Sequence, residues 1–128
     1  MVSDQKLELL APAGNMEKLK VALAFGADAV YFAGEKYGLR SAAKNFSDSE
    51  ILEAIDYCHG LNRKAYMTVN IMPHNEHLDG LREHIRFLGT TDVDGLIISD
   101  PGVMGMVKSE APRLPIHLST QANTTNWM

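Results

Sequence analysis

The feature that most constrains this chain is a regular alternation of short apolar segments with amphipathic helical patterns. The apolar segments predict five strands, at residues 7–10, 28–32, 64–69, 95–99 and 116–118. The patterns between them predict four helices, at residues 16–25, 48–61, 75–88 and 101–111. The strands are short apolar runs rather than alternating patterns, which is typical of parallel strands covered by helices. The sequence therefore predicts an α/β fold built from parallel βα units.

Capping residues mark the starts of three of these helices. Asn15 is a good N-cap for the first helix, and Asp100 before Pro101 has the same role for the fourth. Ser47 and Glu50 form a capping box at the second helix, because each side chain can bind the backbone N–H of the other. The inner face of this second helix is predicted to be Ile51, Ala54, Ile55, Cys58 and Leu61.

Two architectures begin with this order of elements, an open doubly wound sheet and a (β/α)8 barrel. No glycine-rich fingerprint follows the first strand, and polar residues recur where the strands end. Both observations favour a TIM-type barrel, of which residues 1–128 would be the N-terminal half and a single partial domain. Half a barrel leaves its first and fifth strands with unpaired edges. We therefore expect either a fragment or a chain that forms a homo-oligomer through these edges.

Composition and charge exclude several classes of protein. The 45% hydrophobic and 22% charged residues are ordinary for a soluble globular domain. No apolar run approaches the ~18–20 residues that span a bilayer, and residues 1–6 lack the features of a secretory signal. We therefore expect no membrane partner and a cytoplasmic location. The net charge of −4 argues against a basic surface across the whole domain.

Polar residues at the strand ends are the main candidates for a functional site. In a barrel, the carboxyl ends of all strands meet on one face. The residues expected there are Pro12 to Gly14, Gly34, Glu35, Asn70, Asp100 and Ser119 to Gln121, with Asn123 just beyond. Asn70 would end a buried strand, where an amide needs partners, so we predict that it lines a pocket. For Asp100, the helix cap alone is an equally good explanation.

The long connection over residues 33–46 holds the best candidate for an anion contact. The planar guanidinium of Arg40 suits a carboxylate or a phosphate, whereas Lys36 and Lys44 are expected to be solvated. The alternative is a solvated loop with an ion pair between Glu35 and Arg40. The substrate-binding residues predicted from the sequence are Glu35, Arg40, Asn70, Gln121 and Asn123.

His117, Ser119 and Asp100 are the candidate catalytic residues. His117 and Ser119 alternate on the fifth strand, so both side chains point to the same side of the sheet. They could form a hydrolytic pair, but no third member of a triad is visible. A histidine that binds polar neighbours inside the barrel explains His117 at least as well.

The other histidines and the single cysteine do not predict a metal site. His74 and His77 miss the spacing of the metallopeptidase motifs, and His77 and His84 lie ~10.5 Å apart along a helix axis. That separation is too large for two ligands of one zinc ion. Cys58 and His59 point ~100° apart on a helix, so they do not form a nucleophile–base pair. Cys58 is predicted to lie in the core.

Several stretches together resemble the peptidase U32 family, which is also named the collagenase-like protease family. The matching stretches are residues 8–14 (ELLAPAG), 26–31 (GADAVY), 37–40 (YGLR), 69–75 (VNIMPHN), 99–102 (SDPG) and 115–123 (PIHLSTQAN). The resemblance implies a TIM-type barrel followed by further domains. Family members include peptidases and proteins needed for hydroxylation of RNA or of quinone precursors. Residues 69–75 look most like the branch that acts in tRNA wobble-uridine hydroxylation.

The same resemblance implies reactants and partners for a full-length protein. Prephenate is implicated in the RNA branch, and an iron–sulfur cluster is bound by cysteines beyond the fifth strand. No cofactor is expected within this chain, because Cys58 matches a helix-core position. For the full-length protein, tRNA is the expected partner.

Three hypotheses follow from the sequence. The chain is the N-terminal part of a barrel whose full-length form acts in tRNA uridine hydroxylation. Alternatively, the full-length protein is a peptidase, as the family name says, although the nucleophile, base and orienting residue are not all present. A third hypothesis is a catalytically inert unit that associates through its open sheet edges.

Overall fold

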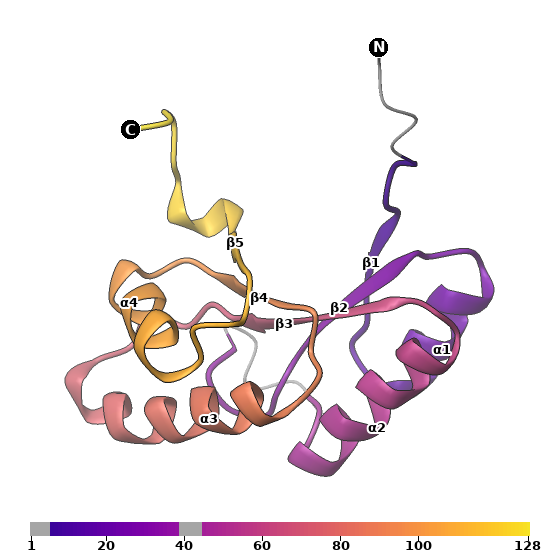
Figure 1. Ribbon diagram of the computed structural model, residues 1–128, viewed down its shortest axis with the longest axis horizontal. Helices are drawn as coiled ribbons and strands as arrows, with labels where there is room; N and C mark the ends of the chain where they lie inside the picture. Colours follow the sequence, from indigo (N-terminus) through magenta and orange to yellow (C-terminus); the bar gives the residue numbers. More distant parts are fainter. Residues whose placement is uncertain (1–5, 39–44) are drawn as a thin grey trace.

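The computed structural model describes residues 6–38 and 45–128 as one parallel sheet with a layer of helices (Figure 1). The strands are β1 (Leu10–Pro12), β2 (Ala29–Ala33), β3 (Lys64–Val69), β4 (Gly95–Ile98) and β5 (Ile116–Leu118). The α-helices are α1 (Met16–Ala24), α2 (Asp48–Gly60), α3 (Leu78–Thr90) and α4 (Pro101–Glu110). Two short 3₁₀ helices are η1 (Asn75–His77), before α3, and η2 (Thr120–Ala122), after β5.

The strand order identifies the architecture. The strands lie in the order β1-β2-β3-β4-β5, and every neighbouring pair is parallel. Because crossovers between parallel strands are right-handed, a sheet that grows in one direction carries its helices on one face. In Figure 1, α1, α2 and α3 lie below the strands and α4 lies beside β4 and β5. A doubly wound sheet reverses its order and has helices on both faces, so the prediction of a half TIM-type barrel is confirmed.

The hydrophobic core lies between the sheet and the helices. The strand residues that point toward the helices are buried, namely Val30, Phe32, Met67, Val69, Leu96 and Ile98. The helices contribute Leu19, Ile51, Ala54, Ile55, Cys58, Leu81, Ile85 and Leu88. Phe46, just before α2, closes this core against Phe32, with 4.5 Å between the ring centroids. Alternate strand residues therefore point to the opposite, helix-free face.

The predicted helix caps are present. The Asn15 side chain accepts a hydrogen bond of 2.8 Å from the backbone N–H of Lys18 at the start of α1. At α2, the Ser47 backbone N–H donates to Glu50, and the Glu50 N–H donates to the Ser47 hydroxyl, which completes the capping box. Asp100 caps α4 through a 3.0 Å hydrogen bond from the Val103 N–H.

The first strand differs from the prediction in both place and burial. The strand is Leu10–Pro12, whereas residues 7–10 were expected, and the side chain of Leu7 is 91% exposed. Two hydrogen bonds hold the backbone of Leu9. The Leu9 N–H donates to the carboxylate of Asp28, and the Asp28 backbone N–H donates to the Leu9 carbonyl. β1 pairs only with β2 in the described residues, so the apolar residues before it lack a cover on the edge side.

Two helix boundaries also differ from the prediction. Leu61 is half-exposed and caps the C-terminus of α2, so it does not extend the buried face. Residues 75–77 form the separate turn η1 rather than the first turn of α3, and His77 Nδ1 accepts the backbone N–H of His74 there.

No helix in residues 6–38 or 45–128 combines the length and the apolar character that a transmembrane span requires.

Candidate functional site

The helix-free face of the sheet carries a row of side chains that lie in register across neighbouring strands. Thr68 pairs in register with Ala33 on one side and with Ile97 on the other, and Ile97 pairs with His117. These residues form one row across four strands, on the face away from the core. Tyr66 lies two residues before Thr68 on β3, toward the strand N-termini, and Asn70 follows the carboxyl end of β3. In a barrel this face is the interior, and its carboxyl end is where active sites lie.

A pocket of about 280 Å³, which we name the mouth pocket, opens at the carboxyl ends of β1, β2 and β3. Its lining residues are Pro12, Ala13, Gly14, Tyr31, Phe32, Ala33, Asn45, Thr68, Asn70 and Gln121. Gln121 comes from η2, after the last strand, yet it lines the same pocket as the turn after the first strand. The sheet is thus curved enough for its two ends to share one site.

The described lining of the mouth pocket is polar but carries no formal charge. Its polar groups are three amide side chains, the Thr68 hydroxyl and the Tyr31 phenol, and the described lining contains no Asp, Glu, His, Lys or Arg. The Thr68 hydroxyl donates a 3.4 Å hydrogen bond to the Phe32 carbonyl, and the Ser99 hydroxyl donates to the Asn70 carbonyl at 3.3 Å. These bonds fix the strand ends that form the floor. Such a site can orient a neutral ligand through paired donors and acceptors.

The structure brings Asn70 and Gln121 together with the predicted turn of Pro12 to Gly14, and it places three other predicted residues in capping roles. Asn70 and Gln121 share the mouth pocket. Asp100 caps α4, and the Ser119 hydroxyl accepts the Gln121 N–H at 3.3 Å and caps η2. Asn123 ends η2 with a φ of 50°, a left-handed conformation that asparagine tolerates. Ser119 and Asn123 thus flank the turn that carries Gln121, whereas Asp100 serves the start of α4.

His117 lies on the interior face, and it is not among the described lining residues of the mouth pocket. Its ring contacts Tyr66, with 4.9 Å between the ring centroids, across the intervening strand β4. Gly95 on β4 makes this contact possible, because a Cβ there would lie 3.2 Å from both Cδ2 and Nε2 of His117. His117 thus forms a ring pair with Tyr66 on the interior face.

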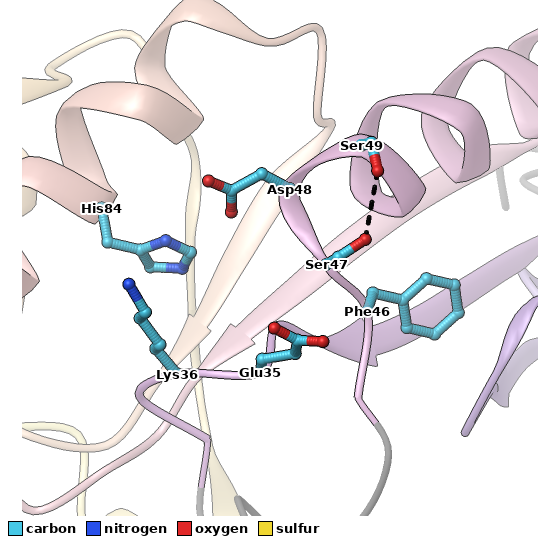
Figure 2. Close-up of a pocket in the computed structure, with 7 residues that line it drawn as sticks. All are labelled: Glu35, Lys36, Phe46, Ser47, Asp48, Ser49 and His84. Carbon is cyan, nitrogen blue, oxygen red and sulfur yellow. Dashed lines mark hydrogen bonds between the residues drawn. The ribbon is translucent and has the colours of Figure 1, made fainter.

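Glu35 lies in a second pocket, of about 320 Å³, on the helix side of the sheet (Figure 2). This pocket is formed by the segment after β2, the start of α2 and His84 of α3. Burial lowers the pKa of His84, against the opposing effect of Asp48, and its Nε2 atom has no hydrogen-bond partner among the described residues. This pocket lies outside the barrel interior. Arg40, the predicted anion contact, falls outside the described residues.

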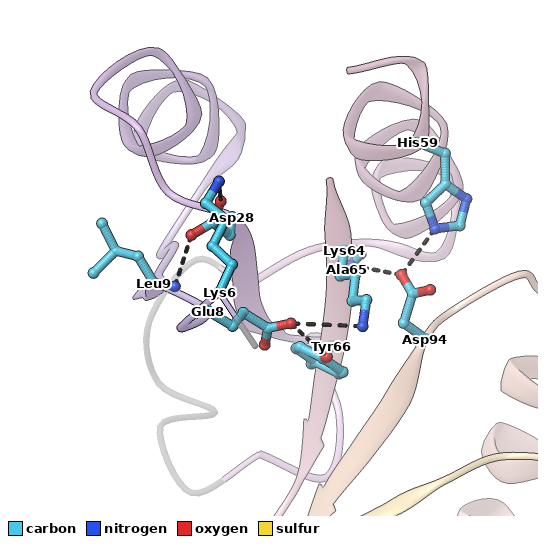
Figure 3. A network of polar contacts seen from close by, with 9 residues as sticks. All are labelled: Lys6, Glu8, Leu9, Asp28, His59, Lys64, Ala65, Tyr66 and Asp94. Carbon is cyan, nitrogen blue, oxygen red and sulfur yellow. Dashed lines mark hydrogen bonds and ion pairs between the residues drawn. The ribbon is translucent and has the colours of Figure 1, made fainter. Parts of the chain in front are cut away.

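The opposite, N-terminal end of the strands carries a network of charges (Figure 3). Asp94 accepts the Ala65 N–H and binds His59 Nε2, both at 2.8 Å. Glu8 binds the ammonium of Lys64 at 3.6 Å and accepts the Tyr66 hydroxyl at 3.4 Å. Burial, with a smaller effect of Glu8, raises the pKa of Tyr66 to about 12. These contacts join the strand starts, where TIM barrels place residues that serve stability.

Thr68, Asn45 and Tyr31 were not among the predicted site residues. Thr68 lies on β3 and Asn70 directly follows its end, so the two-residue period of extended backbone predicts both side chains on one face. That signal could have identified Thr68 once the strand was predicted. Asn45 lies just before α2, far from the other lining residues in sequence, and its position could not be inferred from any local pattern.

Cys58 lies where the sequence predicted. It is fully buried on α2, and burial raises the pKa of its thiol to about 11. A cluster ligand must be an exposed or oriented thiolate, so this residue does not fit an iron–sulfur site. The described residues also contain no group of three or more His, Cys, Asp or Glu side chains arranged to hold a metal ion.

Comparison with known proteins places this geometry in a family. The family model of peptidase family U32 matches residues 14–128, which includes every strand from β2 onward and the whole helix layer. The chain belongs to peptidase family U32. The tRNA hydroxylation protein P1 of Bacillus subtilis is 47% identical over 126 residues, and the alignment covers 98% of this chain and 30% of that protein.

One further relative and one solved structure are also similar to this chain. The 23S rRNA 5-hydroxycytidine C2501 synthase of Escherichia coli is 36% identical, and the alignment covers 95% of this chain and 18% of that protein. The solved structure of the U32 peptidase Mk0906 has a TM-score of 0.73 at 14% identity, over 95% of this chain and 52% of that one, which shows a shared fold. The chain thus spans about 30% of the length of the tRNA hydroxylation relative.

Proposed function

We propose that this chain contributes the mouth pocket to a full-length U32 protein that acts in hydroxylation of a tRNA base. The observation that carries the proposal is the similarity of nearly the whole chain to a tRNA hydroxylation protein, at 47% identity. A similarity to an rRNA hydroxycytidine synthase supports a nucleobase as the modified group. The mouth pocket lies at the carboxyl end of the strands, and its described lining, which is rich in amides and uncharged, suits that substrate.

The chain's residues would bind and orient the base rather than oxidise it. The described lining of the mouth pocket offers amides, a hydroxyl and one phenol, which are groups that hold a ligand through hydrogen bonds. The cysteine ligands of an iron–sulfur cluster would come from beyond this chain, because Cys58 is sealed in the core. Prephenate, an acidic reactant, would bind where the full-length protein supplies cations.

The proposal is tested in a strain that lacks the gene. Digested tRNA from this strain should lose the hydroxylated nucleoside in mass spectrometry, and the full-length gene should restore it. An unchanged nucleoside profile together with altered protein turnover would contradict the proposal and favour a peptidase.

A peptidase mechanism would need a nucleophile within reach of a base. In this structure, the Ser119 hydroxyl accepts the Gln121 N–H, and the His117 ring packs against Tyr66. Purified full-length protein should therefore leave gelatin intact. Cleavage that disappears with Ser119→Ala or His117→Ala would reverse this ranking.

A further inference from the structure

We infer that the mouth pocket receives the uncharged base of a nucleotide while Lys18, beside the pocket, binds the adjoining phosphate. This inference rests on the proposed function. It specifies that the pocket accepts the base of the RNA and rejects an acidic co-substrate. It rests on the charge distribution and size of the pocket and on the place of one lysine.

The first support is the distribution of charge. None of the ten described lining residues carries a formal charge at neutral pH. A carboxylate that leaves water needs a cation or several donors in return, so this lining disfavours an acidic small molecule. A pyrimidine ring is neutral and carries carbonyl and N–H groups on one edge. An amide side chain offers both an acceptor and two donors, so the Gln121 amide can complement that edge.

The amide of Gln121 is the best placed of these groups for ligand contact. Its backbone is fixed, because its N–H donates to the Ser119 hydroxyl within η2. Its side chain lines the pocket and makes no hydrogen bond with the described residues. A ligand in the pocket would meet both the apolar surface of Pro12 and Ala33 and the amide of Gln121.

The second support is the size of the pocket. A volume of about 280 Å³ is near the lower limit of ligand pockets and accepts a single small ring rather than a base pair. A target base would therefore enter as an unstacked, extruded ring. The aromatic ring of Tyr31 and the apolar Pro12 and Ala33 supply surfaces on which such a ring can pack.

The third support is a cation beside the pocket. Gly14 lines the pocket at the turn before α1, and a Cβ there would lie 3.8 Å from the Nζ atom of Lys18. The Lys18 side chain therefore runs along this glycine at the edge of the site. An ammonium is a point charge that suits a phosphate oxygen, which a base held in the pocket would bring to its edge. Among the described residues, the site thus has a neutral lining with the ammonium of Lys18 at its edge, which matches a nucleotide.

This arrangement also separates the two reactants of the proposed reaction. An acidic co-substrate would find no cation among the described residues inside the mouth pocket. It would therefore bind outside this pocket, and it would not compete with the base.

The inference is tested by filter binding of tRNA from the deletion strain to the full-length protein, over a range of salt concentrations. Lys18→Gln should lower the slope of log Kd against log salt by about 1, because one phosphate contact is lost. The matched control is Lys20→Gln, since Lys20 lies two residues further along α1 and contacts the Tyr57 ring, 5.2 Å from its centroid. This control should keep the wild-type slope.

The base contact is tested with a change of charge at nearly constant shape. Gln121→Glu should weaken tRNA binding about tenfold at fixed salt, because a carboxylate cannot donate to the base. Asn126→Asp makes the same change of charge in the exposed C-terminal segment and should bind nearly as the wild type does. Equal affinities of the two variants, or equal salt slopes of the two lysine variants, would overturn the inference.

These outcomes are distinguishable from failure of the proposed function. The function is measured by the modified nucleoside in cells, whereas the inference is measured by RNA binding in vitro. An unchanged nucleoside profile with the expected pattern of binding would refute hydroxylation and retain a nucleotide site. Loss of the nucleoside without that pattern would retain the function and place the base elsewhere. Added prephenate should leave tRNA affinity unchanged, and direct competition would contradict the separation of the two reactants.

Discussion

Gly95 is the residue on which the arrangement of the barrel interior depends most directly. A Cβ at this position would lie 3.2 Å from two atoms of the His117 ring and 3.2 Å from the Pro115 carbonyl oxygen. Gly95→Ala should therefore displace His117 from Tyr66 and lower the free energy of unfolding by about 1–3 kcal/mol, as overpacking usually does. Urea unfolding at neutral pH measures this change.

Gly105→Ala is the matched control for that substitution. Gly105 lies within α4, and a Cβ there would meet nothing within 4 Å. Alanine should therefore raise the free energy of unfolding by about 0.5–1 kcal/mol through its better helix propensity. A Gly95→Ala protein as stable as the wild type would mean that the contact across β4 does not constrain His117.

Cys58 should be chemically inert in the folded protein. Burial raises the pKa of its thiol from 9.0 to about 11, so the thiolate fraction at about pH 8 falls roughly 100-fold. Iodoacetamide at this pH should label the native protein far more slowly than the urea-unfolded protein, as measured by mass spectrometry. Labelling at similar rates would contradict a core position for this thiol.

An ion-pair network joins the neighbouring helices α3 and α4. Glu110 accepts hydrogen bonds from Arg82 Nη1 at 2.6 Å and from Arg86 Nε at 2.7 Å. The hydrogen bond from Arg86, followed by that from Arg82, lowers the pKa of Glu110 below its ordinary 4.5. The network should therefore stabilise the fold above about pH 4.5 and lose its effect as the pH falls toward the lowered, folded-state pKa.

This pH dependence is measured by the urea midpoint between about pH 5 and about pH 3. Wild-type protein should lose more of its midpoint over this range than Glu110→Gln does, because the variant has no carboxylate to protonate. Glu53→Gln is the control, since Glu53 is exposed on α2 and makes no ion pair with the described residues. Equal acid slopes for wild type and Glu110→Gln would show that the network contributes nothing measurable.

The sequence predicted these elements well where a local pattern carries the information. Strand β3 was predicted with its observed bounds, and the capping box of Ser47 and Glu50 begins α2 as expected. The burial of β1 was predicted wrongly, because an apolar run does not reveal whether a neighbour covers it. Leu7 is exposed for that reason.

The candidate site was only partly predictable, because its members meet through tertiary curvature. Asn70 was identified from its place at a strand end, and Gln121 from the polar segment after β5. Their shared pocket requires the sheet to bring η2 close to the turn after β1, which no local pattern encodes. The same limit applies to His117. Its ring occupies space that a side chain at position 95 would fill, and Gly95 lies two residues before Ile97, the register partner of His117 on β4.

The whole molecule should associate through its open edges. In the described residues, β1 and β5 each have one strand neighbour, and Leu9, Leu10 and Leu118 are exposed along them. Unpaired strand edges beside apolar side chains favour pairing with another chain. Light scattering of the 128-residue protein should therefore give a mass above its 14.1 kDa.

Leu118→Lys should reduce that association, because a charge on an edge strand opposes strand pairing. Leu52→Lys is the matched control, since Leu52 is similarly exposed but lies on α2, away from both edges. A wild-type protein that stays monomeric at every concentration would show that the edges are not adhesive.

The two ends of the strands should differ in what they do. The carboxyl end holds a pocket whose described lining is uncharged, and the opposite end holds the network of Glu8, Lys64 and Asp94. The most direct measurement is therefore the amount of hydroxylated nucleoside per unit of full-length protein in a deletion strain that carries single variants. Gln121→Glu and Thr68→Val should lower this ratio strongly, whereas Glu8→Gln should change the amount of protein but not the ratio. A ratio that falls with Glu8→Gln and stays at the wild-type value with both pocket variants would contradict the account.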